Sequence, residues 1–243
     1  MNTTKIAPVL LAMAAAGLFA VCEESGPART ETRTVDLEGA KRAEVELRMG
    51  AGELSVSGAD QAALMEASFR YNRESLKPVI DYRVTGTTGI LDVGRRRHTG
   101  FSLGRVVNDW DLRFSRSVPL DLRVNLGAGE SRLDFRGVDL EGLDIDMGVG
   151  EMTLDLAGPR AKGLHVNING GIGSGKIYLP AEIGVRVHVD GGIGSISASG
   201  LSKSGHAYTN EAYGHNPVAL EVTIDAGIGS LDLRVERGER IRI

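Results

Sequence analysis

Apolar and polar residues alternate along most of this chain. The clearest apolar runs are Leu120, Leu122 and Val124; Leu143, Ile145 and Met147; Leu164, Val166 and Ile168; Val185, Val187 and Val189; and Leu220, Val222 and Ile224. A period of two places alternate side chains on one face of a strand, so each run predicts a half-buried β-strand. The alternation resumes a few residues later, as Met152, Leu154 and Leu156 show.

A Gly-x-Gly motif separates the two halves of each alternating stretch. It occurs at Gly50 and Gly52, Gly127 and Gly129, Gly148 and Gly150, Gly171 and Gly173, Gly192 and Gly194, and Gly227 and Gly229. Successive first glycines are 77, 21, 23, 21 and 35 residues apart, which indicates a repeat near 21 residues with two insertions. Glycine suits turns where backbones approach closely. We predict an all-β, solenoid-like (β-helix-like) fold of stacked repeats, each built as strand, turn, strand, turn.

Two longer excursions interrupt the repeat. The first, residues 60–119, contains predicted strands at 64–71, 79–84, 89–93 and 109–114. The second is the loop 201–217. Helix signals are nearly absent. Because inserted loops often carry function, both excursions are candidate contact regions.

The N-terminus is typical of an export signal. Lys5 precedes an apolar stretch of 16 residues, Ile6 to Val21, which ends at acidic residues 23 and 24. A permanent membrane span needs roughly 20 apolar residues, so this shorter stretch predicts a signal peptide over residues 1–21.

The single cysteine, Cys22, follows this stretch directly. Phe19-Ala20-Val21-Cys22 resembles a lipobox, although Val21 stands where Gly, Ala or Ser is usual. We predict that Cys22 receives a diacylglycerol anchor, that residues 22–39 form the lipidated N-terminus and a flexible tether, and that residues 40–243 form the repeat domain. The alternatives are cleavage after Ala20, which leaves a free thiol, and an apolar leader that buries the cysteine.

Composition narrows the function classes. One cysteine permits no intramolecular disulfide, so stability must come from packing and strand hydrogen bonds. The net charge of −4 gives no indication of a nucleic-acid-binding protein.

Several ordered motifs resemble the bacterial toastrack family, to which the LiaF-like cell-wall-active antibiotic response proteins are related. They are Met49-Gly50-Ala51-Gly52-Glu53-Leu54, Val118-Pro119-Leu120-Asp121-Leu122, Gly148-Val149-Gly150-Glu151 and the three Gly-Ile-Gly-Ser motifs. The resemblance covers about residues 40–243. It implies an envelope-facing β-repeat domain without known catalysis that serves in interaction or in sensing envelope stress.

Two recurring positions flank the glycines. Two residues before them stand Arg48, Asn125, Asp146, Asn169, Asp190 and Asp225, and one residue after them stand Glu53, Glu130, Glu151, Ser174, Ser195 and Ser230. Stacking would align each set in a row. A row of Asn and Asp could bind divalent cations, but these residue types also favour turns, which is the interpretation we prefer. The change from Glu to Ser predicts two subfamilies of repeat.

Other candidate chemistries have weak support. Gly170-Gly171-Ile172-Gly173 begins like a calcium-binding β-roll repeat, but Gly175 stands where the ligating Asp belongs. The repeated serines lack a nucleophile elbow. His165 and His188 lie on outward positions without the convergence that zinc requires. We therefore predict no catalytic residues, no metal and no cofactor.

Contact patches are expected in the two excursions. The candidate residues are Arg95, Arg96, Arg97 and Trp110 in the first, and His206, Tyr208, Tyr213 and His215 in the second. Aromatic and Arg side chains are common in protein and sugar contacts.

These observations predict a non-catalytic, exported lipoprotein of the cell envelope that acts as an interaction, scaffold or sensing module. Its expected partners are the membrane, through Cys22, and an unidentified envelope protein or glycan. The alternative is a carbohydrate-binding or carbohydrate-active β-solenoid, whose carboxylates would come from Asp109, Asp111, Asp144, Asp146 and Asp190. A homo-oligomer could form if the terminal segment 234–243 left an open edge, although its charges oppose such pairing.

Overall fold

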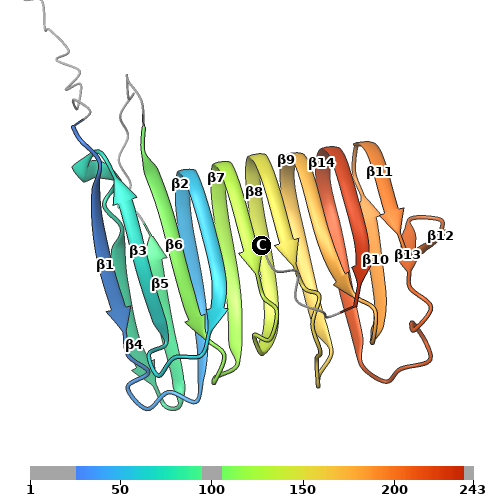
Figure 1. The fold of residues 1–243 in the computed structure, drawn as a ribbon, viewed down its shortest axis with the longest axis horizontal. Coiled ribbons are helices and arrows are strands. Elements are labelled where there is room, and N and C mark those ends of the chain that lie inside the picture. The colour runs from blue at the N-terminus through green and yellow to red at the C-terminus, as the bar shows by residue number, and fades with distance from the viewer. Residues whose placement is uncertain (1–25, 95–105, 238–243) are drawn as a thin grey trace, which may run out of the picture.

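The protein is a rack of β-strands that bend over a common core (Figure 1). The computed structural model describes residues 26–94 and 106–237. Its strands are β1 (Arg29–Val35), β2 (Arg42–Ala59), β3 (Met65–Tyr71), β4 (Val79–Thr85), β5 (Thr88–Gly94), β6 (Asn108–Ser115), β7 (Leu120–Asp134), β8 (Leu140–Asp155), β9 (Leu164–Pro180), β10 (Gly184–Asp190), β11 (Ile193–Ser199), β12 (Ser202–Ser204), β13 (Ala207–Thr209) and β14 (Ala219–Glu236). One 3-10 turn, Glu74–Leu76, follows β3. The all-β prediction and the four strands expected in the first excursion are confirmed.

Five long strands form arches that build two layers. Each of β2, β7, β8, β9 and β14 bends near its glycines, so that its two limbs face each other across the core (Figure 1). In the first layer, β4 and β5 are followed by the N-terminal limbs of the arches in the order β2, β7, β8, β9 and β14. After these come β10, β13 and β12. In the second layer, β1, β3 and β6 are followed by the C-terminal limbs of the same five arches in the same order, and then by β11.

In five of the six motifs the glycines lie within one continuous strand, where the sequence predicted a turn between two strands; in the sixth, Gly192 lies between β10 and β11. Strand pairing continues through the bend, where Gly52 faces Gly129 and Gly129 faces Gly150. Gly129 has φ +134°, and a Cβ there would lie 1.9 Å from the carbonyl oxygen of Gly52. A bend without Cβ atoms lets neighbouring backbones stay at hydrogen-bonding distance, so a separate turn is not needed.

The two subfamilies of repeat bend differently. In β2, β7 and β8 the residue between the two glycines points to solvent, and Val149 is 67% exposed. In β9 and β14 that residue is Ile172 or Ile228, and both are buried. The apolar isoleucine therefore fills the inside of its own arch.

The order of the arches differs from a sequential solenoid. β14, the last strand of the chain, pairs with β9 on one side and with β10 and β11 on the other. The predicted open edge at the chain's end is therefore wrong for the residues that the structure describes, since β14 lies inside both layers. The outer strand of the second layer at this end is β11.

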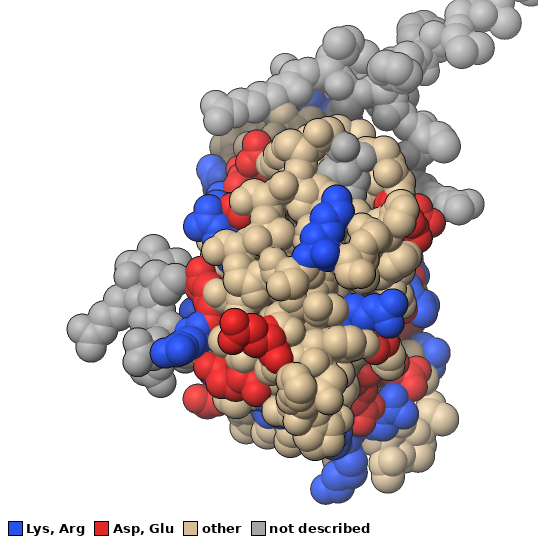
Figure 2. Space-filling view, turned by 90° about the vertical axis from the view of Figure 1, so that its right-hand side faces the viewer, with Lys and Arg blue, Asp and Glu red and all other residues tan. Residues whose placement is uncertain are grey.

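One continuous core lies between the layers. The inward positions of the second layer form straight rows, and one row comprises Leu112, Val56, Leu133, Leu154, Ile177, Leu233 and Ala198. All but the last are at most 2% exposed. The end of the molecule at β10 to β13 is seen in Figure 2, where uncharged residues form much of the face.

The N-terminal boundary lies earlier than predicted. β1 falls within the segment 22–39 that was expected to be a tether, and it pairs with β3 over seven residues from Arg29 to Val35. Thr30, Thr32 and Thr34 face outward, which is the alternation of an edge strand with few apolar residues. Because β1 contains only one apolar residue, Val35, its composition is typical of a tether.

An ion-pair cluster lies where β7 and β8 end, at Asp134 and Asp155. The Arg136 guanidinium lies 2.5 Å from a carboxylate oxygen of Asp134 and 3.2 Å from one of Asp155. Burial alone would raise the pKa of Asp134, but hydrogen bonds and charge from Arg136 hold that pKa below its usual value. Burial raises the pKa of Asp155, and Arg136 opposes that rise.

This cluster gives a pH-dependent stability. A carboxyl group with a depressed pKa in the folded state stabilises the fold above its unfolded pKa, and the contribution is lost as the pH falls through the folded value. We expect Asp134→Asn to lower the free energy of unfolding by about 1 kcal/mol at pH 7, because the pair is partly exposed, and by much less near pH 3. Urea unfolding at both pH values measures this, with Asp139→Asn, whose Lys162 partner is 3.9 Å away, as the control. A loss equal at both pH values would contradict the assignment.

Candidate functional site

The structure describes one residue of the first predicted contact patch, Trp110. Cys22, Arg95, Arg96 and Arg97 lie outside the described residues. Trp110 is 2% exposed, so its assignment to a surface patch is wrong. Its ring stacks edge-on against Phe69 at 5.4 Å, and its Nε1 donates to Asn108 Oδ1 at 3.0 Å. The inward phase of β6 places it in the core.

The second predicted patch is also divided. His206 and His215 are exposed, Tyr213 is half-buried, and Tyr208, the middle residue of β13, is 5% exposed. Lys203 of β12 lies over the Tyr208 ring at 5.4 Å. Tyr208 therefore serves the core, and the exposed remainder of this patch consists mainly of the two histidines.

The row of Asn and Asp residues forms on the outer face of the first layer. Its order in space is Arg48, Asn125, Asp146, Asn169, Asp225 and Asp190. Asn169 donates to Asp146 at 3.2 Å, and in the next row Asn167 donates to Asp144 at 2.8 Å. These amide–carboxylate bonds link neighbouring strands and use the carboxylate oxygens that a cation would need.

The structure brings together two histidines that the sequence placed apart. His188 Nε2 lies 2.8 Å and His206 Nδ1 lies 3.4 Å from the Asp190 carboxylate. Within residues 26–94 and 106–237, no three His, Cys, Asp or Glu side chains form a group that could hold a metal ion.

The carboxylates required by the carbohydrate-active alternative are divided between the two layers. Asp109 and Asp111 lie on β6 in the second layer, Asp144 and Asp146 on β8 in the first layer, and Asp190 at the end of β10. Glycoside hydrolysis usually needs two carboxyl groups within about 10 Å across one bond to be cleaved. Carboxylates on opposite outer faces of the rack cannot flank one substrate bond, so only the pairs on one strand, Asp109 with Asp111 and Asp144 with Asp146, share a face.

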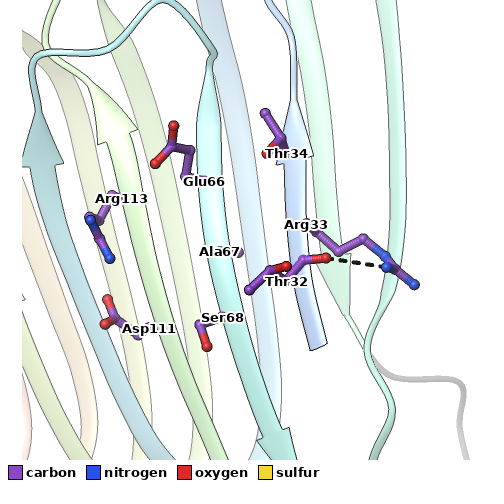
Figure 3. A pocket seen from close by; sticks show the side chains of 8 residues that line it. All are labelled: Thr32, Arg33, Thr34, Glu66, Ala67, Ser68, Asp111 and Arg113. Carbon is purple, nitrogen blue, oxygen red and sulfur yellow. Dashed lines mark hydrogen bonds between the residues drawn. The ribbon is translucent and has the colours of Figure 1, made fainter. Parts of the chain in front are cut away.

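A shallow polar hollow lies on the outer face of β1, β3 and β6 (Figure 3). Its volume is about 140 Å³, and its lining is Thr32, Arg33, Thr34, Glu66, Ala67, Ser68, Asp111 and Arg113. Strand register aligns Thr32 with Ser68 and Asp111, and Thr34 with Glu66 and Arg113. Hydroxyl, carboxylate and guanidinium groups here can hydrogen-bond a small polar group. The sequence did not predict this hollow, because the polar composition of residues 29–35 favours a tether. The alternating threonines of β1 were the pattern that could have indicated a strand.

Charged side chains close the inner side of β1. Glu31 accepts a hydrogen bond from the Tyr71 hydroxyl at 2.9 Å and lies 3.4 Å from the Lys77 ammonium. Arg33 pairs with the same glutamate. These contacts take the place of apolar packing at this end of the core.

Two layers of arched strands with polar outer faces define this as an all-β, two-layered domain. The chain belongs to the toast_rack N-terminal domain family, DUF2154, whose profile matches residues 24–178. The profile of the LiaF C-terminal domain of cell wall-active antibiotics response proteins matches residues 127–233. The resemblance inferred from the glycine motifs is thereby confirmed.

One of the solved structures to which this chain is similar shares its architecture. A "putative cell adhesion protein" from Clostridium sporogenes ATCC 15579 is 31% identical, with a TM-score of 0.82 over 86% of this chain and 100% of that chain. A "putative adhesin" from Bacteroides fragilis NCTC 9343 is 10% identical, with a TM-score of 0.30 over 86% of this chain and 98% of that chain. A search of curated proteins gave no significant match. The two family profiles and the Clostridium protein fit a non-catalytic, envelope-associated module, and none of their names is that of an enzyme.

The described part of the chain holds no helix that is both long and apolar enough to cross a membrane.

Proposed function

We propose that this protein is an exported, lipid-anchored module of the cell envelope that binds another envelope component and performs no chemistry of its own. The observation that carries the proposal is the position of β1. This first strand is an outer strand of the second layer, at one end of the rack (Figure 1). In the sequence, Cys22 precedes it by a short segment.

The length of that segment limits how far the β1 end of the domain could lie from the membrane. Six residues separate Cys22 from Arg29, and an extended chain spans about 3.5 Å per residue, so the link reaches roughly 20 to 25 Å. A lipid on Cys22 therefore keeps the β1 end near the membrane. The opposite end, at β10 to β13, is then free to lie away from the membrane, where a partner can reach it.

Mass spectrometry of the protein from the membrane fraction of its native host tests the anchor. We expect a mass increment of diacylglycerol size on Cys22, with loss of both the increment and membrane retention in Cys22→Ala. Ser25→Ala, three residues away, should keep both, since it leaves the thiol in place. One acyl chain binds membranes only marginally, so two chains are needed for stable retention.

An unlipidated chain in the soluble fraction would overturn the anchored part of the proposal. It would favour a free periplasmic or secreted binding protein.

A further inference from the structure

The four outer strands of the rack differ in charge. Three carry charged side chains: Arg29, Glu31 and Arg33 on β1, Asp81 and Arg83 on β4, and Lys203 on β12. β11 has the sequence Ile-Gly-Ser-Ile-Ser-Ala-Ser and carries none. Charges on outer strands, especially those that point inward, prevent the addition of further strands. Among the described strands, β11 is the outer strand without this protection.

The core is also incomplete beside β11. Ile196 continues the inward position of Leu231, and Ala198 continues that of Leu233. Leu231 and Leu233 are 2% and 0% exposed, whereas Ile196 and Ala198 are only half-buried against the core. The apolar rows therefore reach this end of the second layer, and none of the described strands covers them there.

The first layer extends farther at this end than the second. β11 faces β10, because the two strands are the limbs of one arch through Gly191 and Gly192. Beyond β10 the first layer adds β13 and β12, while in the described residues nothing pairs with the outer side of β11. The second layer is thus shorter, and Figure 2 shows much uncharged surface at this end.

We propose that β11 binds an extended peptide segment of another envelope protein, with apolar side chains at alternate positions, which adds to the second layer as a further strand. This deepens the proposed function by naming the class of partner. Main-chain hydrogen bonds would supply affinity, as in other strand additions, and apolar side chains on alternate residues would cover Ile196 and Ala198. The added strand lies over β13 and makes the layers more nearly equal in width.

A peptide fits this edge better than a second copy of the chain. Antiparallel pairing of two β11 strands requires a twofold axis normal to the layer. That axis would bring β12 and β13 of both copies into the same space, because β13 pairs with residues 186–188 of β10, opposite the middle of β11. A single extended peptide brings no second copy of β12 and β13, so it would not clash.

Fluorescence anisotropy with the mature chain, extracted from membranes in detergent, tests the proposal. The probe is a labelled peptide that copies residues 228–235 with Asp232→Ser and Arg234→Ser, so that it keeps alternating leucines and has no charge. Two further probes carry Lys or Glu at both of those outward positions. The variant Ser195→Lys with Ser197→Lys places two charges on the outward face of β11. The matched control is Ser55→Lys with Ser57→Lys, two outward serines with the same spacing on β2, inside the second layer.

We expect all three peptides to bind the wild type with similar micromolar affinity. The β11 variant should bind the Glu peptide about tenfold more tightly than the Lys peptide, because directly opposed charges interact across neighbouring strands. The β2 variant should not discriminate. Amide hydrogen exchange should slow in residues 193–199 on binding, and not in residues 29–35.

No saturable binding to the wild type, equal binding of all peptides by the β11 variant, or exchange protection elsewhere would overturn the proposal. A concentration-dependent dimer in sedimentation that the β11 charges dissociate would also overturn it, since a second copy would then occupy this edge. None of these results depends on the lipid, so the failure of the anchor and the failure of the peptide site are distinguishable.

Discussion

Gly150→Ala is expected to destabilise the protein by about 3 to 5 kcal/mol, or to prevent folding. Gly150 has φ +150°, a region that L-residues rarely adopt, and a Cβ there would lie 1.8 Å from the carbonyl oxygen of Gly129. That oxygen belongs to the backbone of the neighbouring arch, so it cannot move away without breaking the strand pairing between β7 and β8.

Gly227→Ala is the matched control for this substitution. Gly227 is the first glycine of the motif in β14, whereas Gly150 is the second glycine of the motif in β8. A Cβ at Gly227 would meet nothing within 4 Å, and its φ is outside the positive range. We expect a change within about 0.5 kcal/mol. Urea unfolding followed by far-ultraviolet circular dichroism measures both variants. If both variants lost the same free energy of unfolding, close backbone approach would not be the reason why Gly150 is needed.

Trp110→Ala is expected to lower the free energy of unfolding by about 3 to 5 kcal/mol. The indole is 2% exposed, and its loss would leave a cavity beside Phe69 and remove the donor to Asn108. Asn108 itself donates to the carbonyl oxygen of Ala51 at 2.6 Å, so the effect extends to the bend of β2. Trp110→Phe should cost less, because a ring remains.

His215→Ala, an exposed member of the other predicted patch, serves as the control and should change stability by less than about 0.5 kcal/mol. The same urea experiment decides. If Trp110→Ala left stability unchanged while a binding activity was lost, the surface-contact interpretation of Trp110 would be right and the buried position wrong.

The strands of this protein follow from local pattern to an unusual degree. Period-two alternation around residues 120–124 and 143–147 predicted strands that the structure contains, because the alternation of side chains across a pleated strand is a property of the strand alone. The same reasoning recovered β3 to β6 within the first excursion. It missed β1, whose outward threonines and inward charges give no apolar periodicity.

The candidate sites were predicted less well, for a physical reason. Whether Trp110 or Tyr208 faces the core or the solvent depends on the face that its strand presents, and one residue of offset reverses the answer. Residue type favoured contact surfaces, but the phase of β6 and β13 placed both rings inside. The pairing of His188 and His206 around Asp190 likewise needed β13 to fold back onto β10.

The sequence by itself determined that the chain forms an all-β rack, where its strands bend, and which residues align in rows, because glycine geometry and side-chain alternation act within a few residues. Only the tertiary structure decided that β14 inserts between β9 and β10, and hence that β11 is the outer strand of the second layer. Any two arches with matching apolar rows can pair, so their order depends on how the connecting segments return across the rack. That order determines which edge is left unpaired.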